Sequence, residues 1–155
     1  MRKFAPIPLS IWQDQFLKKN RSLTLFYIYL RSSPQSNMLY LYNFSIVLAC
    51  DDLKISLDEF NNNIDILEEE GYLQFDADNQ MIWIRHAMIL DMPMLKKTDN
   101  KVYGIQKLVN ALDYCKCKSF LIDNFKEEFT TIYHLKYKKP KAKKQAPCKP
   151  LVSPL

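Results

Sequence analysis

The feature that most constrains the fold of this chain is residues 56–84, where a capped amphipathic helix leads directly into two short apolar runs. Ser56 and Glu59 have the spacing of a capping box, in which each side chain satisfies a free backbone N–H at the start of a helix. Apolar residues recur there at steps of three and four, so one helix face is expected to be buried: Leu57, Phe60, Ile64 and Leu67. Gly71 is predicted to end the helix, because a left-handed C-terminal position favours glycine.

A β-hairpin is predicted directly after this helix. Residues 72–75 and 81–84 have strand patterns, and the polar residues 76–79 between them form a turn. Three shorter elements are predicted ahead of the helix: a buried helix capped by Ser22 at residues 23–32, a strand at residues 38–42 and a helix at residues 44–52.

This order of helix, strand, helix, helix and hairpin is typical of a winged helix-turn-helix, a scaffold used mostly for nucleic-acid binding and protein pairing. We therefore predict an α+β, mostly helical fold with the winged helix at residues 21–92. Residues 1–20 are expected to form an N-terminal arm with a short helix around Ile11 and Leu17. Residues 93–135 predict two additional C-terminal helices, and residues 136–155 predict a disordered basic tail. Thr98 or Asp99 is expected to cap the first additional helix and Ser119 the second.

The positive charge of the chain is concentrated at its C-terminal end. The net charge is +5, but residues 1–128 hold 15 Lys and Arg against 17 Asp and Glu, a balance of 15 − 17 = −2. Residues 129–155 hold seven lysines and no acid, a balance of +7. No apolar run reaches the roughly 18–20 residues that a membrane span requires. The basic start is interrupted by Pro6 and Pro8, which is unlike a secretory signal, so a cytoplasmic protein without a membrane partner is expected.

The sequence does not contain the residue sets of a metal centre or an active site. Cys115 and Cys117 are separated by a single residue, and the two histidines, His86 and His134, are far apart, whereas structural zinc sites use spaced pairs. No nucleophile with a base and an orienting group can be assembled. We expect no metal, no cofactor and no enzymatic activity. Cys50 is expected to be a buried apolar residue, His86 a surface residue at the end of the wing, and residues 68–70 a solvated helix end.

Several segments resemble the winged-helix domains of phage replisome organisers and DnaD-like replication initiators. The resemblance covers about residues 10–133 and is carried by residues 25–37, 38–44, 57–76, 81–84, 97–105 and 119–129. It implies a role in starting DNA replication for a phage, plasmid or mobile genetic element. Members of this family bind double-stranded origin DNA or assemble on it, and help to recruit the replicative helicase or its loader. Longer members continue beyond the end of this chain, which is therefore expected to be either a fragment or a short stand-alone protein.

The predicted third helix contains asparagines that favour DNA binding and acidic residues that oppose it. Asparagine can pair with adenine through two hydrogen bonds, so Asn61 and Asn62 are candidates for base contacts, and Asn63 beside them is also expected to point outward. Residues 56–70 also carry six acids and no base, and a duplex repels such a surface. Three interpretations stay open for this face: a solvated surface, a base-reading surface and a protein-contact surface.

Phosphate contacts are expected from isolated cations and from the tail. Lys54 lies in the turn before the third helix, and Arg85 at the end of the wing. Further cations that could contact phosphate are Lys18, Lys19, Arg21, Lys96 and Lys97. Lysines without acids or arginines predict sequence-independent contacts, although a solubilising tail is the alternative. The candidate tail residues are Lys136, Lys138, Lys139, Lys141, Lys143 and Lys144. The chain has more aromatic residues than a small core is expected to bury, which predicts a homo-oligomer. The alternative functions are a protein–protein interaction module and a transcriptional repressor.

Overall fold

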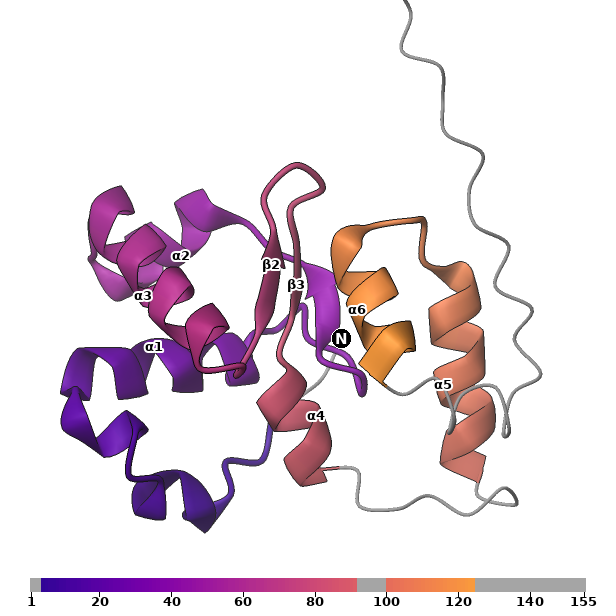
Figure 1. The fold of residues 1–155 in the computed structure, drawn as a ribbon, viewed down its shortest axis with the longest axis horizontal. Coiled ribbons are helices and arrows are strands. Elements are labelled where there is room, and N and C mark those ends of the chain that lie inside the picture. Colours follow the sequence, from indigo (N-terminus) through magenta and orange to yellow (C-terminus); the bar gives the residue numbers. More distant parts are fainter. Residues whose placement is uncertain (1–3, 92–99, 125–155) are drawn as a thin grey trace, which may run out of the picture.

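The computed structural model describes residues 4–91 and 100–124, and it confirms an α+β, mostly helical chain (Figure 1). Two short 3-10 helices begin the chain in place of the single helix expected, η1 at Leu9–Gln13 and η2 at Leu17–Lys19. The elements that follow are α1 Arg21–Ser32, β1 Leu41–Asn43, α2 Ile46–Leu53, α3 Leu57–Glu69, β2 Gln74–Asp76, β3 Met81–Trp83, α4 Arg85–Asp91, α5 Asn100–Ala111 and α6 Lys116–Asn124.

Helix α1 begins two residues earlier than expected, because a different residue caps it. The side chain of Asn20 accepts the backbone N–H groups of Ser22 and Leu23 at 2.9 and 3.3 Å. Ser22 therefore lies inside the helix, where its hydroxyl donates to Glu59 at 3.0 Å. The capping box at α3 is correspondingly half formed: Ser56 Oγ accepts the Glu59 N–H at 3.1 Å, but the Glu59 carboxylate bonds α1 instead.

The three strands form an antiparallel sheet in the order β1-β3-β2. Trp83 on the central strand lies opposite Leu41 on one side and Gln74 on the other. Strand β1 starts later than expected because Tyr40 takes a positive φ of 53°, which an extended strand does not allow. The hairpin is likewise shifted, since Asp76 belongs to β2 and the turn occupies residues 77–80.

Two residues with a left-handed backbone conformation fix the turns before and after α3. Lys54 ends α2 with a φ of 55°, and the Ile55 N–H bonds back to Cys50 O at 3.1 Å, which turns the chain sharply into α3. Gly71 has a φ of 73°, and the Tyr72 N–H bonds back to Leu67 O at 2.8 Å. The predicted role of Gly71 is confirmed, because only glycine adopts this conformation without steric cost.

One core holds the helices and the sheet together. Helices α1–α3 lie on one side of the hairpin, and α5 and α6 lie on the other (Figure 1). Phe60 is fully buried among three other aromatic rings, with centroids 5.4 Å from Phe26 of α1, 5.9 Å from Phe44 between β1 and α2, and 6.1 Å from Phe75 of β2. Leu57, expected on the same buried face, is 55% exposed, because it occupies the first turn of α3, outside this cluster.

Two features of the C-terminal half differ from expectation. Helix α4 was not predicted, because residues 85–91 follow directly on the apolar pattern of the hairpin. Helix α6 begins at Lys116 and not after Ser119, since Cys115 Sγ accepts the Lys118 N–H at 3.3 Å and acts as the cap. Cys117 is buried beneath α6, where its thiol donates to Gln74 O at 3.3 Å. Cys50 is half-buried, so it is less enclosed than expected.

The inward face of α5 follows the predicted pattern where the structure describes it. Ile105 and Val109 are buried, while Leu108 and Leu112 are partly buried against the core. The predicted cap at Thr98 or Asp99, and the proposed lysine-rich segment, lie outside the described residues.

Candidate nucleic-acid interface

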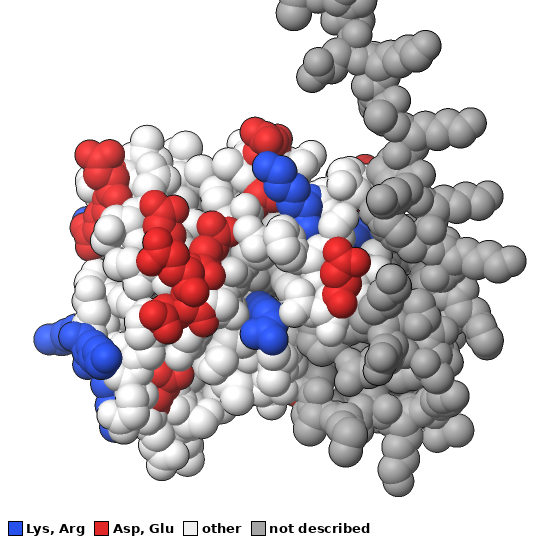
Figure 2. Space-filling model, in the orientation of Figure 1, with Lys and Arg blue, Asp and Glu red and all other residues white. Residues whose placement is uncertain are grey.

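The exposed surface of α2 and α3 is acidic (Figure 2). Seven carboxylates are exposed on these helices and at the end of α3: Asp51, Asp52, Asp58, Glu59, Asp65, Glu69 and Glu70. Lys54 is also exposed, but its ammonium lies 2.8 Å from Asp51 Oδ1, which partly offsets its charge. The hydrogen bond and charge of each partner lower the pKa of Asp51 and raise the pKa of Lys54. Because these carboxylates and the phosphates of DNA are both negatively charged, this face is poorly suited to binding a phosphate backbone.

The asparagine run of α3 is divided between surface and core. Asn61 and Asn62 are exposed and free to contact a partner, whereas Asn63 is only 3% exposed and faces inward. The prediction that Asn63 points outward is therefore wrong, because residues 60, 63, 64 and 67 share the buried side of α3. Two exposed amides remain among carboxylates, which leaves little support for base reading by this helix.

Glu68 is also not the solvated residue that its position in an acidic run predicts. Its Oε1 accepts the Phe75 N–H at 2.6 Å and the Gln74 amide at 2.7 Å, and so joins α3 to β2. Burial raises the pKa of the Glu68 carboxyl, an effect that the bond from Phe75 opposes. Glu68 therefore orients the hairpin instead of facing solvent freely.

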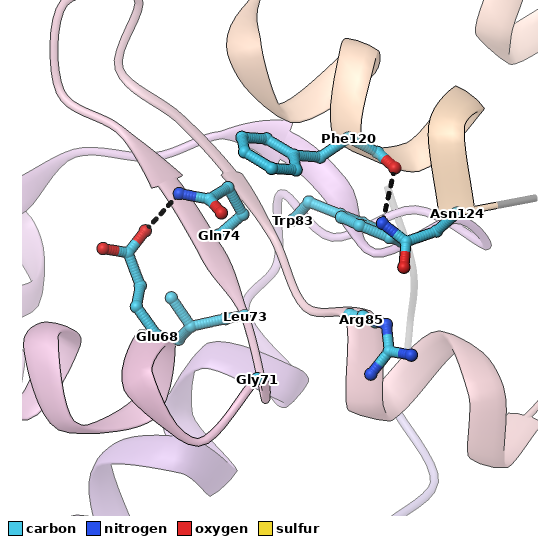
Figure 3. Close-up of a pocket in the computed structure, with 8 residues that line it drawn as sticks. All are labelled: Glu68, Gly71, Leu73, Gln74, Trp83, Arg85, Phe120 and Asn124. Atoms are coloured by element: carbon cyan, nitrogen blue, oxygen red, sulfur yellow. Dashed lines mark hydrogen bonds between the residues drawn. The ribbon is translucent and has the colours of Figure 1, made fainter.

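A hollow of about 230 Å³ lies where the hairpin, the Gly71 turn and α6 meet (Figure 3). Its lining combines apolar, amide and charged groups: Glu68, Gly71, Leu73, Gln74, Trp83, Arg85, Phe120 and Asn124. Trp83 is almost fully buried, while the Phe120 ring is 45% exposed. Helix α6 meets the end of the hairpin at this site, and none of the predicted binding residues belongs to that helix.

Arg85 is the positive group of this hollow. It follows the second hairpin strand, and it is also the first residue of α4, directly after Ile84. A Cβ at Gly71 would lie 4.0 Å from Arg85 Nη1, so the guanidinium is next to the Gly71 turn. The Nε of Arg85 is buried and has no hydrogen-bond partner among the described residues. A buried unpaired donor on a charged group is costly unless a ligand satisfies it.

His86, next to Arg85, belongs to a partly buried polar cluster and is not the freely exposed surface residue expected. Its Nδ1 lies 2.7 Å from the Tyr27 hydroxyl, and its ring centroid lies 4.4 Å from that of Tyr72. The Tyr72 hydroxyl donates to Asp14 Oδ2 at 2.6 Å, which ties the N-terminal segment to the same cluster. Burial lowers the pKa of His86, and the charges of Arg31 and Arg85 lower it further against the opposing effect of Asp14.

The pKa of His86 predicts a loss of stability in mild acid. The folded state disfavours the charged His86 ring. The contribution of neutral His86 to the stability of the fold is therefore fully present above its ordinary pKa of 6.5, and it is lost as the pH falls through the lower pKa of the folded state. We expect the urea midpoint to decrease between about pH 7.5 and about pH 5.5. His86→Gln should flatten that dependence, and an equal slope in His86→Gln and the parent chain would contradict this account. Asp14 titrates below its ordinary 3.8, outside this window, because the bonds from Tyr72, Leu17 and Phe16 outweigh its burial.

Other predicted phosphate contacts are distributed unevenly. Lys18, Lys19 and Arg21 are exposed together just before and at the start of α1. Lys96, Lys97 and the candidate residues Lys136, Lys138, Lys139, Lys141, Lys143 and Lys144 lie outside the described residues. Within residues 4–91 and 100–124, no group of three or more His, Cys, Asp or Glu side chains is arranged to hold a metal ion.

Comparison of the chain with protein-family models, with curated proteins and with solved structures finds no match to any of them. Across the described part of the chain, no helix combines the length and the apolar character that crossing a bilayer would need.

Proposed function

We propose that this chain is a winged-helix DNA-binding protein that acts in replication initiation for a phage, plasmid or mobile genetic element. The winged-helix assignment is supported by the element order α1, β1, α2, α3, β2, β3 and by the sheet order β1-β3-β2. The tight left-handed turn at Lys54 joins α2 to α3 in the manner of a helix-turn-helix. The replication role is supported by the sequence resemblance described above, and recruitment of a helicase or its loader is part of the same proposal.

The observation that carries DNA binding is the separation of charge along the chain. The acids cover α2 and α3, whereas the seven lysines of residues 129–155 are accompanied by no acid. Most of the affinity of proteins for duplex DNA comes from neutralised phosphates, and these lysines can supply that term without a recognition helix. In this proposal the acidic face of α3 is turned away from the duplex, and the lysines contact it.

A binding titration of the full chain tests this function. Fluorescence anisotropy with labelled origin repeats of the element, and with scrambled DNA of equal length, is measured at two salt concentrations. We expect duplex binding that weakens steeply with salt, and tighter binding to the origin repeats only where groups other than the lysines contact the bases. No duplex binding at low salt would refute the DNA-binding function, and equal affinity for both sequences would refute site-specific initiation.

A second candidate function, a protein-interaction module, is favoured by exposed apolar residues on the acidic side. Val47 and Leu48 of α2 are 78% and 56% exposed, and Leu25 of α1 and Leu57 of α3 are 57% and 55% exposed. Such residues next to carboxylates suit a basic, amphipathic partner. Of the aromatic residues that suggested self-association, four are buried and two are partly buried: Tyr27, Tyr40, Tyr42 and Trp83 in the first group, Tyr29 and Tyr72 in the second. A homo-oligomer stays a prediction.

A further inference from the structure

The hollow between the hairpin and α6 has the chemistry of a site for one unpaired nucleotide. We propose that it binds a base and its phosphate within a single strand of nucleic acid, next to the duplex contacts of the proposed function, on which this inference rests. The chain would then hold duplex DNA through its lysines and a separated strand through this hollow. Four properties of the hollow lead to this assignment: its positive charge, its amide oxygens, its half-exposed aromatic ring and its size.

Arg85 provides the position for a phosphate. Its buried Nε lacks a partner among the described residues, and a guanidinium next to a turn can donate to an oxyanion in two parallel hydrogen bonds. In Figure 3 the Arg85 guanidinium lies below the Asn124 amide on the right side of the view, and the Glu68 carboxylate lies on the left side. The positive and the negative group are therefore at opposite ends of the hollow. A ligand that fits this arrangement carries an anionic group at one end and a hydrogen-bond donor at the other.

The rest of the lining suits a base. The Gln74 and Asn124 amino groups already donate, to Glu68 at 2.7 Å and to Phe120 O at 2.8 Å, so their side-chain oxygens are the atoms left to accept. Exocyclic amines of bases are donors of the required kind. Phe120 is a half-exposed ring above these amides (Figure 3), and unpaired bases bind proteins largely by stacking on such rings.

The size of the hollow separates a nucleotide of a strand from a free small molecule. A volume of about 230 Å³ is below the roughly 300–1,000 Å³ of typical small-molecule sites. It accommodates one unit of a longer ligand that continues over the surface. A duplex does not fit the same hollow, because its bases are stacked and paired and cannot reach Phe120. An acidic peptide would use Arg85 but has no need of the amide oxygens, so it is the less favoured occupant.

Substitutions in the full chain test this site against matched controls. Labelled single-stranded DNA, RNA of the same sequence and duplex DNA are titrated by anisotropy at raised salt, where the lysine contribution is reduced. Phe120→Ala and Arg85→Gln should each weaken single-strand binding on the order of tenfold and leave duplex binding nearly unchanged. Phe120→Trp should retain binding. The controls are Tyr114→Ala, which removes a ring that is 54% exposed, and Lys107→Gln, which removes one exposed cation of α5; both should bind like the parent.

The outcomes separate this inference from the function on which it rests. Single-strand binding that is unaffected by Phe120→Ala and Arg85→Gln would overturn the nucleotide site, while salt-dependent duplex binding would still stand. Equal losses for single strand and duplex would also overturn it, because a general phosphate contact predicts that result. Displacement of the single strand by an acidic peptide, with the same dependence on Phe120, would assign the hollow to a peptide. Absence of binding to every nucleic acid would refute the proposed function itself.

Discussion

Replacing six lysines of the C-terminal segment with glutamine is expected to weaken duplex binding about 100-fold or more at low salt. The residues changed are Lys136, Lys138, Lys139, Lys141, Lys143 and Lys144. Each phosphate neutralised by a lysine contributes about 0.9 to the slope of log affinity against log salt, so losing six contacts should also flatten that slope by up to about 5. Anisotropy titrations of origin repeats over a range of salt concentrations measure both quantities.

The matched control for this experiment is the same chain with arginine at the six positions. Arginine keeps the charge, so the salt slope should stay close to that of the parent chain. Because lysine contacts to phosphate do not read sequence, the glutamine variant should lose affinity for origin and scrambled DNA by the same factor. Unchanged affinity in the glutamine variant would show that these residues are only a solubilising segment.

The second large effect is expected for Asp91→Ala, which should lower the free energy of unfolding by about 3–5 kcal/mol. Arg31 is fully buried in α1, and Asp91 is its carboxylate partner at the end of α4. The guanidinium is held further by Pro6 O at 3.2 Å and by the Tyr40 ring, whose centroid lies 5.2 Å from Arg31 Cζ. Tyr40 itself donates to Asp91. Removing the carboxylate therefore leaves a buried cation without a counter-charge.

Urea unfolding with linear extrapolation measures this loss. The double variant Arg31→Met with Asp91→Ala should recover a large part of the stability, since no unpaired charge is then buried. Asp51→Ala is a surface control that removes a carboxylate from the exposed pair with Lys54 and should leave the urea midpoint unchanged. A midpoint for Asp91→Ala close to that of the parent would mean that Arg31 is not held in the core by this pair.

Local signals in the sequence were sufficient for several elements of the fold. The spacing of Ser56 and Glu59 located the start of α3, and Gly71 located its end, because capping and left-handed positions depend on a few neighbouring residues. Alternation located the hairpin to within two residues. The start of β1 was missed because the positive φ of Tyr40 is imposed by packing, which no pattern in residues 38–42 indicates.

The candidate site was predicted less completely, because it depends on contacts between distant segments. Arg85 was identified as an isolated cation, but Phe120 was read only as part of an amphipathic helix. These residues are 35 positions apart and meet because α6 packs on the hairpin, where Lys116 N–H donates to Asp76 at 2.8 Å. Arg31 was likewise predicted only as part of the helix at residues 23–32, and Glu68 as part of a solvated helix end. Their partners, Asp91 and Phe75, lie on other elements.

We propose that nucleic acid contacts the C-terminal lysines, that a single strand also contacts Arg85, and that the acidic face of α3 is turned away from both ligands. Backbone amide NMR of the labelled full chain, recorded during titration with origin duplex and with a single strand, tests this most directly. We predict shifts in the lysine segment with both ligands, shifts at Arg85 and Phe120 with the single strand, and no shifts at Asn61 or Asn62. The largest shifts at Asn61 and Asn62, with none at Arg85 or the lysines, would contradict the account.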